Sequence, residues 1–212
     1  MLELIKKYNY ISFGVVFIVL PALLFSLGDT PSRTLLKETT SLITILSFSL
    51  ILGQFFLSRT NKLTTKIHKY KSVISLHKAI GYVVIGVFFL HPFLIVLPRY
   101  FEVGPKPLES LIKMITTFES LGVILGLIAW SLMLIIGITA YFRQKLNISY
   151  KSWRVIHGLL SAVFIVVATW HSVDLGRHTG TAMSLYFIIV AFMGLALLLK
   201  LYIFTNKKKE SK

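Results

Sequence analysis

The chain has 212 residues, of which 55% are hydrophobic and only 15% are charged, and its mean hydropathy is +0.77. Soluble globular domains carry roughly a quarter charged residues, so this composition predicts an integral membrane protein. The chain has no cysteine, which excludes disulfides, thiolate metal sites, iron–sulfur clusters and thiol redox chemistry. A formal net charge of +15 would suggest nucleic acid in a soluble protein, but here the positions of the charges indicate membrane topology, and we expect no nucleic-acid partner.

Six long apolar runs predict six transmembrane helices. In chain order they cover residues 9–28, 40–58, 73–98, 119–142, 155–174 and 181–205. The first run follows Lys6 and Lys7, but it contains Pro21 and lacks a small-residue cleavage site, so we interpret it as an uncleaved span rather than a signal peptide. We expect residues 1–212 to form one membrane domain, an all-α bundle of six spanning helices.

Lysine and arginine are distributed unequally between the two sides of this arrangement. Seventeen of the 23 lie on the side that holds both termini and the segments 59–72 and 143–154. The other side holds six of them and six of the eight acidic residues, so it is near neutral. By the positive-inside rule, both termini are expected in the cytoplasm, with the protein in an inner or plasma membrane. The basic loops, including the segment around His68, then lie near anionic lipid headgroups.

Four of the six histidines are placed at equal spacing. His77 and His91 lie fourteen positions apart in the third predicted span, and His157 and His171 lie fourteen apart in the fifth. Fourteen positions are close to four helical turns, so both histidines of a span project from nearly the same face, about 21 Å apart along the axis. Both spans are expected to run outward. His77 then faces His157 near the cytoplasmic surface (the first pair), and His91 faces His171 near the outer surface (the second pair).

Two facing imidazoles are the ligands that a haem iron takes from opposite sides. One membrane histidine is usually explained by an interhelical hydrogen bond, but ionisable groups inside spans are costly, and four at two equal spacings favour ligation. The main alternative of another class is a metal or haem transporter that holds its cargo transiently. Transport sites for zinc or iron usually add carboxylates, whereas Asp174 lies only at the outer edge of the fifth span. We therefore expect two stacked b-type haems between the third and fifth helices.

The residues around the histidines resemble those of a known family. They read LHKAIGY around His77, FFLHPF around His91, SWRVIHGLL around His157 and ATWHS around His171. The sequence resembles the ferric reductase and NADPH oxidase transmembrane domain over its whole length, although only the third and fifth spans carry specific motifs. The resemblance implies that electrons pass from a cytoplasmic donor through an inner haem, held by the first pair, and an outer haem, held by the second pair. It also implies an extracytoplasmic acceptor such as ferric iron or oxygen.

Large members of that family carry a cytoplasmic FAD and NADPH domain after the sixth span, and residues 206–212 leave no room for one. No glycine-rich dinucleotide loop is present, and the HPF triplet at 91–93 lies inside a span. We expect an oxidoreductase component that receives electrons from a separate flavoprotein, from FMN or FAD supplied by a partner, or from quinol, unless the chain is a fragment of a longer protein. The runner-up is the haem membrane subunit of the bacterial periplasmic methionine sulfoxide reductase system; four intact ligands favour the reductase-like interpretation.

Other residues are expected to support haem binding. Phe164 lies seven residues from both histidines of the fifth span, so it packs midway between the haems and is a candidate electron bridge, opposite Val84 on the third span. Haem propionates are anionic and attract cations and hydrogen-bond donors at the membrane surfaces. The candidates are Tyr150, Lys151, Arg154 and Lys78 for the inner haem, and Arg99, Arg177 and His178 for the outer haem.

Simpler roles compete with these for some residues. Interfacial snorkelling explains each lysine equally well, and His178 is expected at the surface. Trp153 and Trp170 are expected in the interfacial aromatic belt. The segment 99–118 is expected to cover the outer haem and shape acceptor access, and small residues are expected to allow close approach of the macrocycle or a helix, namely Gly81, Gly86 and Gly158.

Overall fold

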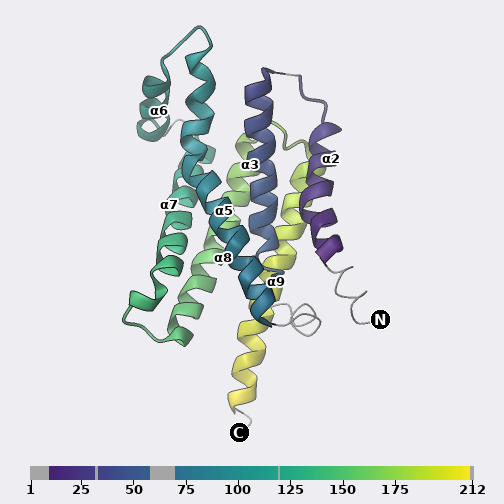
Figure 1. Ribbon diagram of the computed structural model, residues 1–212, viewed down its shortest axis with the longest axis vertical. Coiled ribbons are helices and arrows are strands. Elements are labelled where there is room, and N and C mark those ends of the chain that lie inside the picture. The colour runs from purple at the N-terminus through teal and green to yellow at the C-terminus, as the bar shows by residue number, and fades with distance from the viewer. Residues whose placement is uncertain (1–9, 32, 58–69, 119, 211–212) are drawn as a thin grey trace.

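The computed structural model describes residues 10–31, 33–57, 70–118 and 120–210, and every regular element in these ranges is a helix (Figure 1). In chain order the elements are η1 (Val15–Val19), α2 (Leu20–Ser26), α3 (Leu35–Gly53), α5 (Tyr70–Val96), η2 (Leu97–Tyr100), α6 (Pro107–Thr116), α7 (Leu121–Tyr141), η3 (Arg143–Lys145), α8 (Tyr150–Leu175) and α9 (Thr181–Glu210). The π-helical turn η1 continues into α2, so one apolar helix covers Tyr10–Ser26. The predicted helical class is confirmed for these ranges. The basic loop expected at 59–72, with His68, lies almost wholly outside the described residues.

Five helices, α3, α5, α7, α8 and α9, are long and apolar enough to cross a membrane. The chain is therefore a multi-pass protein of the lipid bilayer. The N-terminal helix, Tyr10–Ser26, is shorter, and a helix of about 17 residues is at the lower limit for a hydrocarbon core of about 30 Å. By length, the structure thus supports five of the six predicted spans.

Two helices, α3 and α8, begin five residues earlier than their apolar runs predicted. α3 covers Leu35–Gly53 rather than 40–58, because Lys37 and Glu38 lower the hydropathy of its first turn without preventing helix formation. A carboxylate in the first turn interacts favourably with the helix dipole, so Glu38 belongs inside the helix. α8 begins five residues before the predicted 155 because Ser149 caps it, with the Ser149 Oγ accepting from the Ser152 N–H at 3.1 Å.

A proline near the N-terminus creates a link between three helices. In η1 the N–H groups bond to carbonyls five residues back, but Pro21 has no N–H to give to the carbonyl of Val16. The hydroxyl of Tyr186 on α9 donates to this carbonyl at 3.0 Å. The hydroxyl oxygen of Tyr186 also lies 2.5 Å from Ser49 Oγ on α3. The N-terminal helix is therefore joined to α9, and through Tyr186 to α3, by two hydrogen bonds.

The helices form one bundle around an apolar core. α7 packs along α8, α3 packs against α5, and α9 contacts both α8 and α3. The core between them contains Phe48, Val84, Met133, Ile165 and Phe187. Figure 1 shows the α7–α8 loop, the start of α5 and the end of α9 at one end of the bundle, with α6 and the α2–α3 and α8–α9 connections at the other.

Candidate functional site

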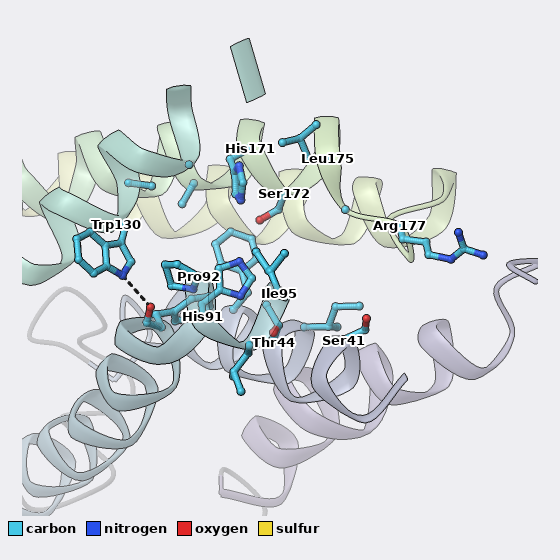
Figure 2. Close-up of a pocket in the computed structure, with 18 of the residues that line it drawn as sticks. Ser41, Thr44, His91, Pro92, Ile95, Trp130, His171, Ser172, Leu175 and Arg177 are labelled. Atoms are coloured by element: carbon cyan, nitrogen blue, oxygen red, sulfur yellow. Dashed lines mark hydrogen bonds between the residues drawn. The ribbon is translucent and has the colours of Figure 1, made fainter. Parts of the chain in front are cut away.

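The four paired histidines lie on two helices, His77 and His91 on α5 and His157 and His171 on α8. His77 and His157 are close enough to interact electrostatically, and so are His91 and His171. Figure 2 shows His91 and His171 directed toward one another from opposite sides of a cavity. The structure thus brings together the two members of each predicted pair, at levels separated by about 21 Å along the helices.

The helices that carry these histidines are held apart by their neighbours. In the described structure α8 packs mainly against α7 and α9, while α5 packs mainly against α3, α6 and α7. A cavity of about 540 Å³ lies around the second pair, and its wall is mostly apolar, with residues such as Phe48, Ile95 and Leu127. Sites for small molecules and cofactors typically have volumes of about 300–1,000 Å³ and apolar walls. The imidazoles of the second pair therefore face one another across a space of cofactor size.

α7 fixes the ring of His171. The Nδ1 of His171 lies 2.8 Å from the carbonyl oxygen of Gly122. A carbonyl only accepts, so Nδ1 carries the proton and Nε2 of the neutral ring keeps a free lone pair. Gly126, one turn along α7, lies against the same ring, because a Cβ built there would be 2.6 Å from its Cε1 and Nδ1. Metal-binding histidines are typically oriented in this way, through the nitrogen that does not bind the metal.

A proline and a tryptophan fix the helix turn that carries His91. Pro92 lies inside α5 and has no N–H, so the carbonyl of Phe88, four residues earlier, loses its intrahelical donor. The indole Nε1–H of Trp130 on α7 donates to this carbonyl at 3.1 Å, the dashed line in Figure 2. The Nδ1 of His91 is buried and has no hydrogen-bond partner among the described residues. α7 therefore supports both members of the second pair, although it carries no histidine itself.

Buried polar atoms without partners also gather at the first pair. The Nδ1 atoms of His77 and His157 are buried and unpaired within the described ranges, and so are both amide atoms of Gln54, which lies near the His77 ring. Trp153 stacks on the ring of His157, with centroids 4.9 Å apart. A Cβ at Gly81, one turn after His77, would meet no described atom within 4 Å. Each unpaired buried polar group costs about 1–3 kcal/mol, so the first pair contains a cluster of polar groups that the described residues do not satisfy.

A packed apolar layer separates the two pairs. Val84 and Phe164 are 1% and 8% exposed and belong to one buried cluster with Met133 and Ala168. Phe164 also lines the cavity of the second pair. Phe164 and Val84, which were expected midway between the two pairs, are therefore part of a tightly packed layer of the core.

Two of the predicted propionate partners reach the cavity of the second pair. Arg177 and His178 line it. His178 is not a surface residue, as the sequence had suggested, but is 8% exposed, with Nδ1 2.9 Å from Thr30 Oγ1 and Nε2 2.9 Å from a carboxylate oxygen of Glu38. Burial holds the pKa of His178 below its usual value, and the neighbouring Glu38 only partly opposes this effect.

In the part of the chain that the structure describes, the other predicted propionate partners do not line this cavity. Arg99 is exposed and is not part of the cavity wall among the described residues. Tyr150, Lys151 and Arg154 lie on the first two turns of α8, before His157, where Tyr150 and Lys151 are exposed and Arg154 is half-buried. They thus lie near the first pair, between His157 and the end of the bundle that holds the α7–α8 loop.

Two cations near the second pair were missed from the sequence. Arg33 and Lys37, at the start of α3, line its cavity. Arg33 pairs with Glu38 at 3.0 Å and Lys37 pairs with Glu102 at 2.5 Å. Their positions on the near-neutral side were visible in the sequence, but nothing in it brought the start of α3 to the histidines. Met114 of α6 also lines the cavity, consistent with the cover expected from segment 99–118.

The support from α7 was missed as well. Gly122 and Gly126 form a small-xxx-small pattern, which is typical of close helix packing in membranes and was a usable signal. Trp130 offered no such signal, because its partner is a carbonyl that a proline frees on another helix.

The ligand set of each pair fits an iron porphyrin better than a bare metal ion. Among the described residues, no group of three or more histidine, aspartate or glutamate side chains is placed to hold a metal ion. A haem iron needs only two axial ligands from the protein, because the porphyrin nitrogens supply the others. Each pair supplies two imidazoles, and at the second pair an apolar cavity lies between them.

Comparison with known proteins points in the same direction. Residues 43–168 match the family described as ferric reductase like transmembrane component, a stretch that begins in α3 and ends just before His171. An uncharacterized protein of Archaeoglobus fulgidus is 34% identical over 168 residues, covering 79% of this chain and 91% of that protein. No solved structure matches the chain. The chain therefore belongs to the ferric reductase-like transmembrane family, whose members are oxidoreductase components associated with electron transfer across membranes.

Proposed function

We propose that this chain binds two b-type haems, one at each histidine pair, and transfers electrons one at a time across the membrane. The observation that carries the proposal is that the four histidines form two close pairs on helices held apart by their neighbours, with His91 and His171 directed toward one another. When bound, haem supplies the one-electron chemistry of its iron, which alternates between the ferric and ferrous states.

At the second pair, His91 and His171 are the proposed axial ligands. The carbonyl of Gly122 holds the proton of His171 on Nδ1 and leaves Nε2 for iron. The apolar wall of the cavity excludes water, and Arg177 supplies a cation for a propionate. His178 already contacts Thr30 and Glu38. We therefore assign it the role of joining the α8–α9 connection to the α2–α3 connection and the start of α3 beside this cavity.

At the first pair, His77 and His157 are the proposed ligands. Tyr150, Lys151 and Arg154 lie one to two turns nearer the end of the bundle, where the propionates of the inner haem are expected. Phe164 lies between the two sites, where an aromatic ring fills the gap and shortens the path for electrons between them.

The charge distribution supports a direction for the transfer. The α7–α8 segment carries Arg143, Lys145 and Lys151 without an acidic residue, whereas Arg33 and Lys37 at the opposite end are paired with glutamates. By the positive-inside rule, the first pair then lies toward the cytoplasm, with both termini there and the N-terminal helix as a sixth span. Electrons enter at the first pair from a separate flavoprotein, a flavin or quinol. They leave from the second pair to an extracytoplasmic acceptor such as ferric iron or oxygen.

The test is the haem content per polypeptide, with the reduced-minus-oxidised spectrum, of the purified wild type and of His77→Ala and His91→Ala. We expect two low-spin b haems in the wild type and about one in each variant. Leu90→Ala is the matched control, because Leu90 is 49% exposed and directly precedes His91; it should keep both haems. A wild type without haem, or a His91→Ala variant with an unchanged content, would contradict the proposal and favour a transient cargo site.

A further inference from the structure

A stack of side chains leads from the α7–α8 loop to the first pair. The rings of Tyr150 and Trp153 lie with centroids 6.0 Å apart and planes inclined by 19°. Trp153 in turn stacks on His157, at 4.9 Å and 27°. The guanidinium carbon of Arg143 lies 4.2 Å from the ring centroid of Tyr150 and 5.4 Å from that of Trp153. A cation in η3, just after α7, is therefore connected, through two aromatic rings, to the half-buried imidazole of His157 on α8.

Trp153 differs from an ordinary interfacial tryptophan. A belt tryptophan keeps its indole N–H near water and headgroups. The Nε1 of Trp153 is buried and has no hydrogen-bond partner in the described part of the chain. Trp170 on the same helix is 58% exposed and fits the belt role expected for both. The contacts of Trp153 are made by the faces of its ring. The position of Trp153 is therefore explained by ring stacking and not by a hydrogen bond of its indole N–H.

The two histidines of α8 are oriented by different means. The Nδ1 of His171 is hydrogen-bonded to Gly122, whereas the Nδ1 of His157 has no such partner among the described residues. Metal-binding histidines usually depend on that hydrogen bond to fix the ring plane. At His157 the indole face of Trp153 covers the ring and restricts its rotation instead.

We propose that Trp153 is a positioning residue for His157, held in place by Arg143 and Tyr150, and that it sets the plane of the imidazole at the first site. The inference rests on the proposed function, because a fixed plane matters most when the ring binds iron. Axial ligand geometry and the groups around it are what a protein uses to tune a haem iron. The low-spin spectrum and the reduction potential of one haem should therefore depend on Trp153.

The experiment compares haem-loaded wild type with Trp153→Leu, Trp153→Phe and the control Trp170→Leu. The low-spin electron paramagnetic resonance signals, the potential of each haem by spectroelectrochemical titration, and the rate of haem release to apomyoglobin are measured. In Trp153→Leu we expect both haems to be present, one signal altered, the potential of that haem shifted, and its release about 2- to 10-fold faster, the size of a lost aromatic contact. Trp153→Phe should restore most of each property, and Trp170→Leu should match the wild type.

Unchanged signals, potentials and release in Trp153→Leu would overturn the inference. If that variant does not accumulate as a folded protein, Arg143→Gln takes its place, because it keeps the indole and removes the cation 5.4 Å from it. An altered signal of the same haem in Arg143→Gln supports the inference, and an unaltered one overturns it. Failure of the proposed function is distinguishable, because the wild type would then bind no haem or its haem content would not depend on His157.

Discussion

Substitution of Gly126 by alanine tests how the ring of His171 is held. A Cβ at this position would lie 2.6 Å from the Cε1 and Nδ1 of that ring. Carbon atoms in favourable contact are about 3.5–4.0 Å apart, so the ring must move by roughly 1 Å. That movement disrupts the 2.8 Å hydrogen bond between His171 and the carbonyl of Gly122. Overpacking typically costs about 1–3 kcal/mol, so we expect the affinity for the second haem to fall about 5- to 150-fold.

Gly86→Ala provides the matched control for this substitution. Gly86 lies on α5 nine residues after His77, so it is on the face of the helix opposite that histidine. It is exposed, and a Cβ there would meet no described atom within 4 Å, so the close approach expected at Gly86 is not seen. Alanine is favoured over glycine in a helix by up to about 1 kcal/mol, so this variant should bind haem like the wild type. Haem per polypeptide and the rate of haem release, measured on both variants, give the comparison. If Gly126→Ala retains two haems with the release rates of the wild type, the account of how α7 positions His171 is wrong.

Two further substitutions test the surroundings of the second pair. Trp130→Phe removes the donor to the carbonyl of Phe88 and should lower the free energy of unfolding in detergent by about 0.6–2 kcal/mol. In a Pro92→Ala background residue 92 regains its N–H, so the cost of Trp130→Phe should nearly disappear; an equal cost in both backgrounds would refute the explanation. Because the pKa of His178 is lowered in the folded protein, the unfolded chain takes up a proton first as the pH falls below about 6.5, and stability should decrease there. His178→Gln should flatten this part of the stability–pH curve, and parallel curves for the two proteins would rule out His178 as its source.

The positions of the helices could largely be predicted from apolar runs, but some of their ends could not. α3 begins at Leu35 because a helix tolerates Lys37 and Glu38 in its first turn, whereas hydropathy treats both as a boundary. The capping of α8 by Ser149 is likewise a local hydrogen bond that an apolar window does not detect. Hydropathy reports where lipid can be, and capping and helix dipoles determine where the helix begins.

The pairing of the histidines could be predicted because it depends on helix periodicity and on the expected outward direction of both spans. The support from α7 could not, apart from the spacing of Gly122 and Gly126, because it depends on contacts between helices. Trp130 matters only because Pro92 frees a carbonyl on α5, and Trp153 matters only because its ring lies on that of His157. The burial of His178 likewise depends on Thr30 and Glu38, which are far from it in the sequence.

The most direct test of the central claim is electron transfer across a membrane by the purified, haem-loaded protein. The chain is reconstituted in vesicles that contain trapped ferricyanide, and the membrane-impermeant reductant dithionite is added outside. We predict that ferricyanide is reduced at a rate proportional to the amount of wild-type protein, and that His91→Ala and His157→Ala each abolish this reduction while the vesicles stay intact. If the wild type binds both haems and the trapped ferricyanide remains oxidised, or if both variants transfer electrons like the wild type, the two histidine pairs do not form the transmembrane path.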